Sequence, residues 1–576
     1  MASTDSNRTD VDPVTLEVLW NQLRAIPQEM GSHLRRTAFS PVIKYAQDFS
    51  TGLFSWDGRL VSQGVYTAGH LGSMPISMRR ILEDHFGPDD WNPGDVVLTN
   101  NPYINSGHLP DFFTFEPVFL AETLVGFCVT TGHQNDVGGA APGSQPMRVK
   151  DMFGEGIEIP PIKVYKKGDP DTDVIDLILQ NSRTPTQLHG DIRAHRGASK
   201  VGTDLYRDLV TEFGFDAFQR YVDEIIDRTE ATFREAIREA PDGTHAFEDV
   251  IEGFEEPLPI RVTMTIEDDE IYVDFTGTAP QQPGFSINTP SNYAHAYTLL
   301  SVKTAIDPET PPTHGMMEPV TLHVPEGTLL NPTRPMPVAS RQLVARRIVG
   351  TVNGALHGFV PGRVPADGSQ LYWYVMEFED PDSEEGAILQ DGVYGGAGAG
   401  ATHDGTPPIA AATNVSNTPV EAIEAAHPIR IHAYELMPDT GGAGTHRGGP
   451  GTVRRYEFLQ GAAVQALMDR FETPPWGLEG GEDGTGGRAV HFPTEGEERA
   501  LHSKEGFTAE AGDMLELYTA GGGGYGPPSE RNPDAIRRDV QEELVSAEWA
   551  EARYGPDWRD GMDAADGDGG GPEDPQ

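Results

Sequence analysis

Glycine-rich runs dominate the sequence after residue 360 and restrict what that part of the chain can fold into. They occupy residues 392–400, 441–451 and 521–526, and short apolar segments of β character separate them. Glycine disfavours helix and is common in turns, so we expect a mainly β region with many turns. The first and last runs lack the P-loop pattern and the strand–GxGxxG–helix context of a dinucleotide site, which favours turns over nucleotide binding.

Helices and strands alternate before residue 360. Asp12-Pro13 predicts the start of an N-terminal helix, which Pro27 is expected to kink or end. Asp57-Gly58, between two apolar pairs, predicts a hairpin turn. Apolar spacing along the whole chain predicts strands at 96–98, 112–115, 118–120, 124–131, 245–255, 259–266 and 270–276, and helices at 203–240, 291–305, 339–356 and 533–554.

These patterns predict a multi-domain α+β protein of mixed sheets and helices with a glycine-rich, mainly β C-terminal region. We expect an N-terminal, metal-bearing α/β region at 1–240 and a middle α/β region at 241–360. The glycine-rich region with its terminal helix is expected at 361–556. The Gly, Asp, Pro and Glu residues of 557–576 predict a disordered acidic tail.

The charge of the chain excludes two classes of partner. Its 576 residues carry a formal net charge of −47, and lysine occurs 8 times beside 34 arginines. Such a charge repels nucleic acid and anionic lipid, so we expect neither as a partner. We interpret the acidic surface as an adaptation to high salt, which screens self-repulsion; a surface that binds cations or basic partners is the alternative.

Cys128 is the single cysteine, so an internal disulfide and a Cys-based zinc site are excluded. It lies within an apolar strand pattern, which favours a buried inert thiol over a nucleophile. Residues 1–10 are polar and acidic without the features of a Sec signal, and nowhere do 18 apolar residues run together. We therefore expect a cytoplasmic protein that does not span a membrane.

Two His-x-x-Asp patterns, each beside a glycine and at the end of an apolar β run, are the clearest candidates for chemistry. They are His108 with Asp111 and, 25 residues later, His133 with Asp136. One such pair equally fits a surface hydrogen bond or a buried polar pair, but two copies at strand ends favour a divalent metal site. Asp48, between aromatic residues, is either a turn cap or a further ligand.

Several longer motifs resemble those of the hydantoinase B family. This family includes N-methylhydantoinase B subunits, the C-terminal half of 5-oxoprolinase, and related acetone carboxylase and caprolactamase subunits. One departure lies at 104–107, where many members have a Gly-Gly-Thr run before the histidine. The matching segments, which span nearly the whole chain, are 101–103, 107–111, 133–139, 142–144, 274–281, 417–424, 441–451 and 521–528.

The resemblance implies a metal-bearing B subunit that works with a hydantoinase A-type, ATP-binding partner. The A-type partner would phosphorylate a lactam or hydantoin ring, and the metal-bearing chain would hydrolyse it. Carried over by motif, the metal ligands are Asp48, His108, Asp111 and His133, and Asp136 has a catalytic role in supporting the site or transferring a proton. The ligand set suits Zn²⁺, Mn²⁺ or Fe²⁺ without choosing among them. An acetone-carboxylase-like carboxylase subunit, or a non-catalytic assembly subunit with a structural metal, are the alternatives.

Overall fold

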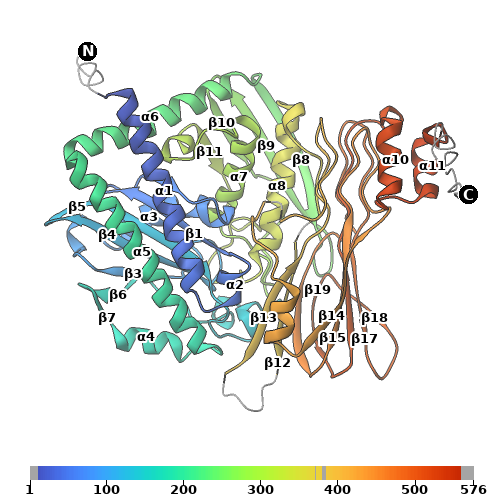
Figure 1. Cartoon of the computed structure of the whole chain (residues 1–576), viewed down its shortest axis with the longest axis horizontal. Coiled ribbons are helices and arrows are strands. Elements are labelled where there is room, and N and C mark those ends of the chain that lie inside the picture. Colours follow the sequence, from blue (N-terminus) through green and yellow to red (C-terminus); the bar gives the residue numbers. More distant parts are fainter. Residues whose placement is uncertain (1–10, 370, 379–384, 411, 560–576) are drawn as a thin grey trace, which may run out of the picture.

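The N-terminal part of the chain is built on a seven-stranded antiparallel sheet with the order β2-β1-β5-β4-β3-β6-β7 (Figure 1). The computed structural model describes residues 11–369, 371–378, 385–410 and 412–559. Asp57-Gly58 forms the predicted turn between the first two strands. The strands of this sheet are β1(Phe49–Ser55), β2(Leu60–Gln63), β3(Val96–Thr99), β4(Asp111–Leu120), β5(Thr123–His133), β6(Ile162–Lys166) and β7(Asp169–Pro170).

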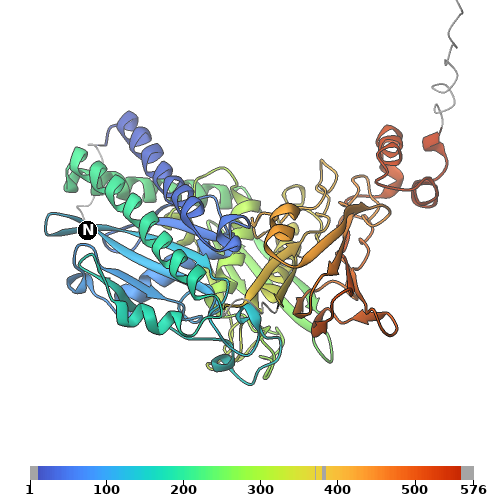
Figure 2. The same cartoon turned by 60° about the horizontal axis from the view of Figure 1, so that its bottom comes forward.

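Helices cover both faces of this sheet because successive side chains of its central strands point to opposite sides. Leu53 and Cys128 face the core shared with α1(Pro13–Thr37), α5(Pro185–Phe213) and α6(Phe215–Arg238). Phe54 and Phe127 face the core shared with α3(Ala68–Asp84). Figure 2 shows α1 and α5 lying across the sheet. Cys128 is fully buried, as predicted, and burial raises the pKa of its thiol well above the usual value.

Two predicted helix boundaries in this region are wrong. Pro27 lies inside α1 and does not end it, because the helix is held by buried residues on both sides of the proline, such as Leu23 and Met30. The region predicted as one helix over 203–240 is two helices. α5 ends at Phe213, and Gly214 has a φ of 74°, a left-handed conformation that interrupts the helix before α6.

The middle of the chain forms a four-stranded sheet of order β11-β10-β9-β8, in which only β10 and β11 are parallel. α8 packs against β8 and β9, and α7 packs between α8 and α3. The middle region therefore adjoins the N-terminal sheet through helices. Its elements are β8(Gly243–Ile251), β9(Leu258–Glu267), β10(Glu270–Asp274), α7(Ser291–Ile306), β11(Val320–His323) and α8(Arg341–His357).

The C-terminal region is a sandwich of two antiparallel sheets, at the opposite end of the molecule from α1 (Figure 1). Tyr372, Tyr374 and Met376 alternate along β12 into the core between the sheets. One sheet has the order β13-β12-β16-β19 and the other β14-β15-β20-β17-β18. The strands are β12(Tyr372–Phe378), β13(Ala387–Val393), β14(Ile429–Met437), β15(Gly451–Phe458), β16(Ala462–Leu467), β17(Arg488–Phe492), β18(Arg499–Leu501), β19(Lys504–Ala509) and β20(Met514–Tyr518).

The predicted terminal helix is also two helices, α10(Pro533–Gln541) and α11(Ala547–Tyr554). Glu543 adopts a positive φ of 58°, and the Ser546 hydroxyl caps α11 by accepting from the Trp549 backbone N–H at 3.1 Å. Most of the predicted acidic tail, residues 560–576, lies outside the described residues. Among the described residues, no helix is long and apolar enough to cross a membrane. The mixed sheets and helices confirm the predicted α+β class.

The glycines of the three C-terminal runs do not form the predicted turns. The runs are extended segments that lie side by side: the Gly522 N–H donates to the Gly449 carbonyl at 2.9 Å, and the Gly449 N–H donates to the Ala397 carbonyl at 2.8 Å. A Cβ on Gly522 would lie 2.0 Å from the Ala397 carbonyl oxygen. Glycine is needed here because backbone contacts backbone.

Candidate metal centre

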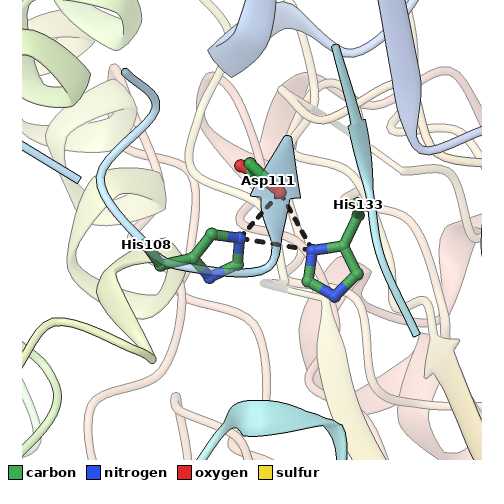
Figure 3. A group of neighbouring side chains, drawn as sticks. All are labelled: His108, Asp111 and His133. Carbon is green, nitrogen blue, oxygen red and sulfur yellow. Dashed lines mark hydrogen bonds and ion pairs between the residues drawn. The ribbon is translucent and has the colours of Figure 1, made fainter. Parts of the chain in front are cut away.

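The β4–β5 hairpin explains the spacing of the two His-x-x-Asp patterns. Asp111 is the first residue of β4, His133 is the last residue of β5, and the two are directly opposed in the antiparallel register. Both side chains therefore lie at the open end of the hairpin. The loop before β4 brings His108 to the same point, and Figure 3 shows the three side chains converging.

The three side chains are buried and their polar atoms are in close contact. His108 Nε2 lies 2.8 Å from Asp111 Oδ1, and His133 Nδ1 lies 3.0 Å from the same oxygen. The two imidazole nitrogens are 3.2 Å apart. These three atoms form a group with the geometry to hold a metal ion.

Hydrogen bonds on the far side of each ring determine which nitrogens carry a proton. His108 Nδ1 lies 3.0 Å from the Ala339 carbonyl oxygen, which can only accept. His133 Nε2 lies 3.0 Å from Gln390 Oε1, whose amide nitrogen donates elsewhere, to the Asn135 carbonyl. When both rings are neutral, their inner nitrogens are lone-pair donors that converge with Asp111 Oδ1. Burial opposes protonation of His133, but its hydrogen bond to Asp111 and the charge of that carboxylate raise the pKa of His133, so a cation would take the place of this proton. A divalent cation fits this arrangement because it satisfies all three.

The second carboxylate oxygen of Asp111 is already fully engaged. It accepts from the Ser106 hydroxyl and from Arg341 Nη2 at 2.7 Å, and it lies 3.0 Å from His70 Nε2. Burial opposes ionisation of Asp111, but its pKa is held well below the usual value, and the charge of the Arg341 guanidinium beside it contributes to this. Burial, with a contribution from Arg341, lowers the pKa of His108 to about 4, which keeps this ring neutral. Asp111 is thus an anion with one oxygen free for a cation.

The structure places the other two predicted site residues differently. Asp48 lines the same small cavity as His108 and His133, where it accepts from the Thr67 hydroxyl at 3.1 Å. It lies outside the cluster of three, with Oδ1 3.9 Å from His70 Nε2.

Asp136 lies outside the residues that line this cavity. Its carboxylate accepts from the backbone N–H groups of Gly138, Gly143 and Arg183 at 2.8 to 3.1 Å, and from the Arg183 guanidinium at 2.9 Å. It therefore stabilises the loop that follows β5 and does not face the cluster.

Sequence reasoning missed His70, Arg341 and Gln390. A Cβ on Gly69 would lie 2.5 Å from the Tyr293 ring, so α3 packs closely on α7 and brings His70 to Asp111. The available sequence signal for His70 was the adjacent Gly69. A glycine in a helix indicates close packing, but it does not indicate a functional site. Arg341 and Gln390 come from distant segments and carry no local signal. The surroundings of the cluster therefore include residues from all three predicted regions, although the cluster itself lies within 1–240.

Glu155 fixes the segment that orients His108. It is fully buried, and its Oε1 accepts from the backbone N–H groups of Val338 and Ala339 at 2.7 and 2.8 Å. Burial raises its pKa from 4.5 to about 8. Between pH 4.5 and about 8, Glu155 is protonated in the folded chain and ionised in the unfolded chain. The free energy of unfolding therefore falls as the pH rises through this range.

We expect the Glu155→Gln variant to lose less stability than the wild type between pH 5 and 8, because the uncharged amide does not titrate. Urea unfolding across this range measures the difference. Glu122→Gln, at an exposed position, is the control and should leave the pH dependence unchanged. An identical slope in Glu155→Gln and wild type would contradict the expectation.

The fold and the site define an α+β protein with a buried His-Asp-His cluster, a candidate metal centre, at the end of a β-hairpin. The sequence matches the family model described as Hydantoinase B/oxoprolinase over residues 12–528. The chain belongs to this family, which confirms the resemblance inferred from the motifs.

Individual relatives match the chain along most of its length. It is 31% identical over 577 residues to a putative B subunit of a D-/L-hydantoinase from Pseudomonas sp. (strain NS671), covering 96% of this chain and 97% of the relative. The crystal structure of an ATP-dependent caprolactamase from Pseudomonas jessenii is similar with a TM-score of 0.87 at 28% identity, covering 95% and 96% of the two chains. A nucleotide-free acetone carboxylase has the same fold, with a TM-score of 0.87 at 19% identity, covering 94% of this chain and 79% of the acetone carboxylase chain.

Proposed function

We propose that this chain is the metal-bearing B subunit of an ATP-dependent cyclic-amide hydrolase. It would hydrolyse a lactam or hydantoin ring that an A-type, ATP-binding partner has activated by phosphorylation. The observation that carries the proposal is the convergence of His108 Nε2, His133 Nδ1 and Asp111 Oδ1, which lie within 2.8 to 3.2 Å of one another in a buried site. Family membership supports it, as do the hydantoinase and ATP-dependent caprolactamase relatives.

His108, Asp111 and His133 would hold a divalent Zn, Mn or Fe ion, and we propose Asp48 as a further ligand from the same cavity. When bound, such an ion would lower the pKa of a coordinated water towards about 7. Ala339 orients the His108 ring through its carbonyl oxygen.

The remaining polar groups position the cluster or accept protons. Gln390 orients the His133 ring, and Arg341 holds Asp111 ionised. His70 lines the cavity, and its Nδ1 has no hydrogen-bond partner among the described residues, so we propose it as a proton acceptor. For Asp136 we propose a positioning role through the loop after β5, in place of proton transfer.

The test combines metal analysis with turnover. We expect near-stoichiometric metal in the wild type, and metal binding at least about 100-fold weaker in His108→Ala and His133→Ala, since even residues that only support a ligand account for 10- to 100-fold. With the A-type partner and ATP, opening of 5-oxoproline or hydantoin rings should fall to background in both variants. His85→Ala, at an exposed position, should keep metal and activity.

Other outcomes of this experiment identify the alternatives. Wild-type protein without metal would refute the ligand assignment. ATP-dependent consumption of acetone and bicarbonate, with no ring opening, would identify a carboxylase subunit. A large fall in melting temperature in His108→Ala, without any turnover in the wild type, would indicate a structural metal in an assembly subunit.

A further inference from the structure

One buried arginine differs from the others in having no acidic partner. In the described part of the chain seven arginines are buried, and Arg346 is the one for which no carboxylate lies within salt-bridge distance. The other six and their partners are Arg341 with Asp111, Arg347 with Asp249 and Asp469, Arg447 with Asp539, Arg454 with Asp391, Arg470 with Asp249 and Asp367, and Arg531 with Asp404 and Asp539.

The contacts of Arg346 leave most of its hydrogen-bonding capacity unused. It is 6% exposed, and its Nη1 donates to the Leu371 carbonyl at 2.8 Å. Its Nε is buried without a partner among the described residues. Burial lowers the pKa of the guanidinium, and Tyr297 and Tyr293 only partly offset this effect. A buried, unpaired charge destabilises the fold, so its presence in a chain with 89 acidic residues points to a ligand that supplies the counter-charge.

Arg346 lies where two cavities meet. It lines the 30 Å³ cavity that contains His108 and His133, which has room for little more than an ion or a water molecule. It also lines a cavity of 450 Å³ together with Ser301 and Asn353, a volume within the range of small-molecule sites. Arg346 is therefore accessible both to a molecule in the larger cavity and to the cavity that contains the cluster.

We propose that Arg346 binds an oxyanion on the reactant, either a carboxylate carried by the ring or the phosphate added during activation. The planar guanidinium suits either group, because two parallel N–H bonds match two oxygens. Arg346 would then orient the ring between the larger cavity and the His108–His133 cluster. The inference rests on the proposed function for the identity of the reactant, and it makes Arg346 a substrate-binding residue.

Two substrates distinguish the two sources of the anion. Arg346→Met and Arg346→Lys are assayed in the full chain with the A-type partner and ATP, on 5-oxo-L-proline and on 2-pyrrolidinone, which has the same lactam ring without a carboxylate. If the carboxylate binds, the KM for 5-oxo-L-proline rises about 10- to 100-fold in Arg346→Met, with partial rescue in Arg346→Lys, and kinetics on 2-pyrrolidinone do not change. If the phosphate binds, kcat for ring opening falls on both substrates while ATP hydrolysis continues. Unchanged kinetics on both substrates would overturn the proposal.

The neighbouring arginine provides a matched control for folding. Arg347 follows Arg346 on α8 and is fully buried, but it is paired with Asp469 at 2.6 Å. Arg346→Met should keep or raise the melting temperature, because it removes an unpaired charge, whereas Arg347→Met should lower it. An equal fall in both variants would show that Arg346 is structural and would refute the proposal.

Direct binding separates this inference from the proposed function. Calorimetry on the purified full chain, with 5-oxo-L-proline, inorganic phosphate and 2-pyrrolidinone as probes, needs no turnover. We expect binding of at least one oxyanion to be lost in Arg346→Met and kept in Arg80→Met, where the arginine is exposed and pairs with Asp84. If no cyclic amide is opened but this binding is seen, the proposed function fails and the anion site stands. If rings are opened and no oxyanion binds through Arg346, the anion site fails and the function stands.

Discussion

Replacing Gly522 with alanine is expected to destabilise the protein by about 3 kcal/mol or more, at the upper end of the range for overpacked sites. The added Cβ would lie 2.0 Å from the Ala397 carbonyl oxygen and 2.4 Å from its carbonyl carbon. Both atoms belong to the backbone of the neighbouring extended segment, so no side chain can rotate away. The Gly522 N–H bond to the Gly449 carbonyl would be strained by the same displacement.

Urea unfolding of Gly522→Ala and of Gly461→Ala measures this effect. Gly461 lies in the same region, but its nearest atom to an added Cβ is 3.6 Å away, an ordinary contact, so we expect a change within about 0.5 kcal/mol. Similar unfolding midpoints for the two variants would show that the glycine segments can separate without cost. That result would contradict the close backbone packing described above.

Arg347→Met is expected to lower the free energy of unfolding by about 3 kcal/mol, because it removes one positive partner from two buried carboxylates. Arg347 Nε contacts Asp469 at 2.6 Å, and Nη1 contacts Asp249 at 3.2 Å. Arg470 and Lys504 pair with the same two carboxylates, which places the expected loss at the lower end of the range for broken buried pairs. The network joins α8 to β8 and to the C-terminal segment, so its loss should loosen contacts between the regions.

Arg80→Met is the control for this prediction. Arg80 pairs with Asp84 on the surface, where both side chains are about half exposed, and such pairs contribute between about 0 and 1 kcal/mol. Chemical unfolding compares the two variants under the same salt. Losses of equal size would mean that the buried network of Arg347 contributes no more than a surface pair.

The position of the candidate metal centre connects it to the packing of the whole fold. The cluster residues come from the β4–β5 hairpin and the loop before it, while Ala339 and Gln390 orient the two imidazoles from the middle and C-terminal regions. Correct ring orientation therefore requires all three regions to be packed together. If the proposed metal site is correct, substitutions that loosen the glycine segments or the Arg347 network should weaken metal binding without changing a proposed ligand.

Local patterns in the sequence were sufficient for much of the fold. The Asp12 cap, the Asp57-Gly58 turn and the helices at 291–305 and 339–356 depend on interactions within a few residues, and the structure contains them, with the helix ends within two residues of the prediction. The α+β class and the expectation that the two His-x-x-Asp patterns form one site follow from the same kind of signal, whereas the ligand set His108, Asp111 and His133 came from the family resemblance. Two motifs 25 residues apart at strand ends become neighbours when the strands form one hairpin.

Tertiary structure decided what the local patterns left open. Burial on both sides of Pro27 keeps α1 continuous, and backbone packing gives the glycine runs an extended conformation in place of turns. His70 and Arg341 reach Asp111 only because α3 and α8 pack beside the hairpin. Sequence by itself determined many of the elements and placed the two His-x-x-Asp patterns at strand ends, since these features arise from short-range geometry. The contacts among segments more than 200 residues apart, which orient the cluster and leave Arg346 without a partner, are set by packing in three dimensions.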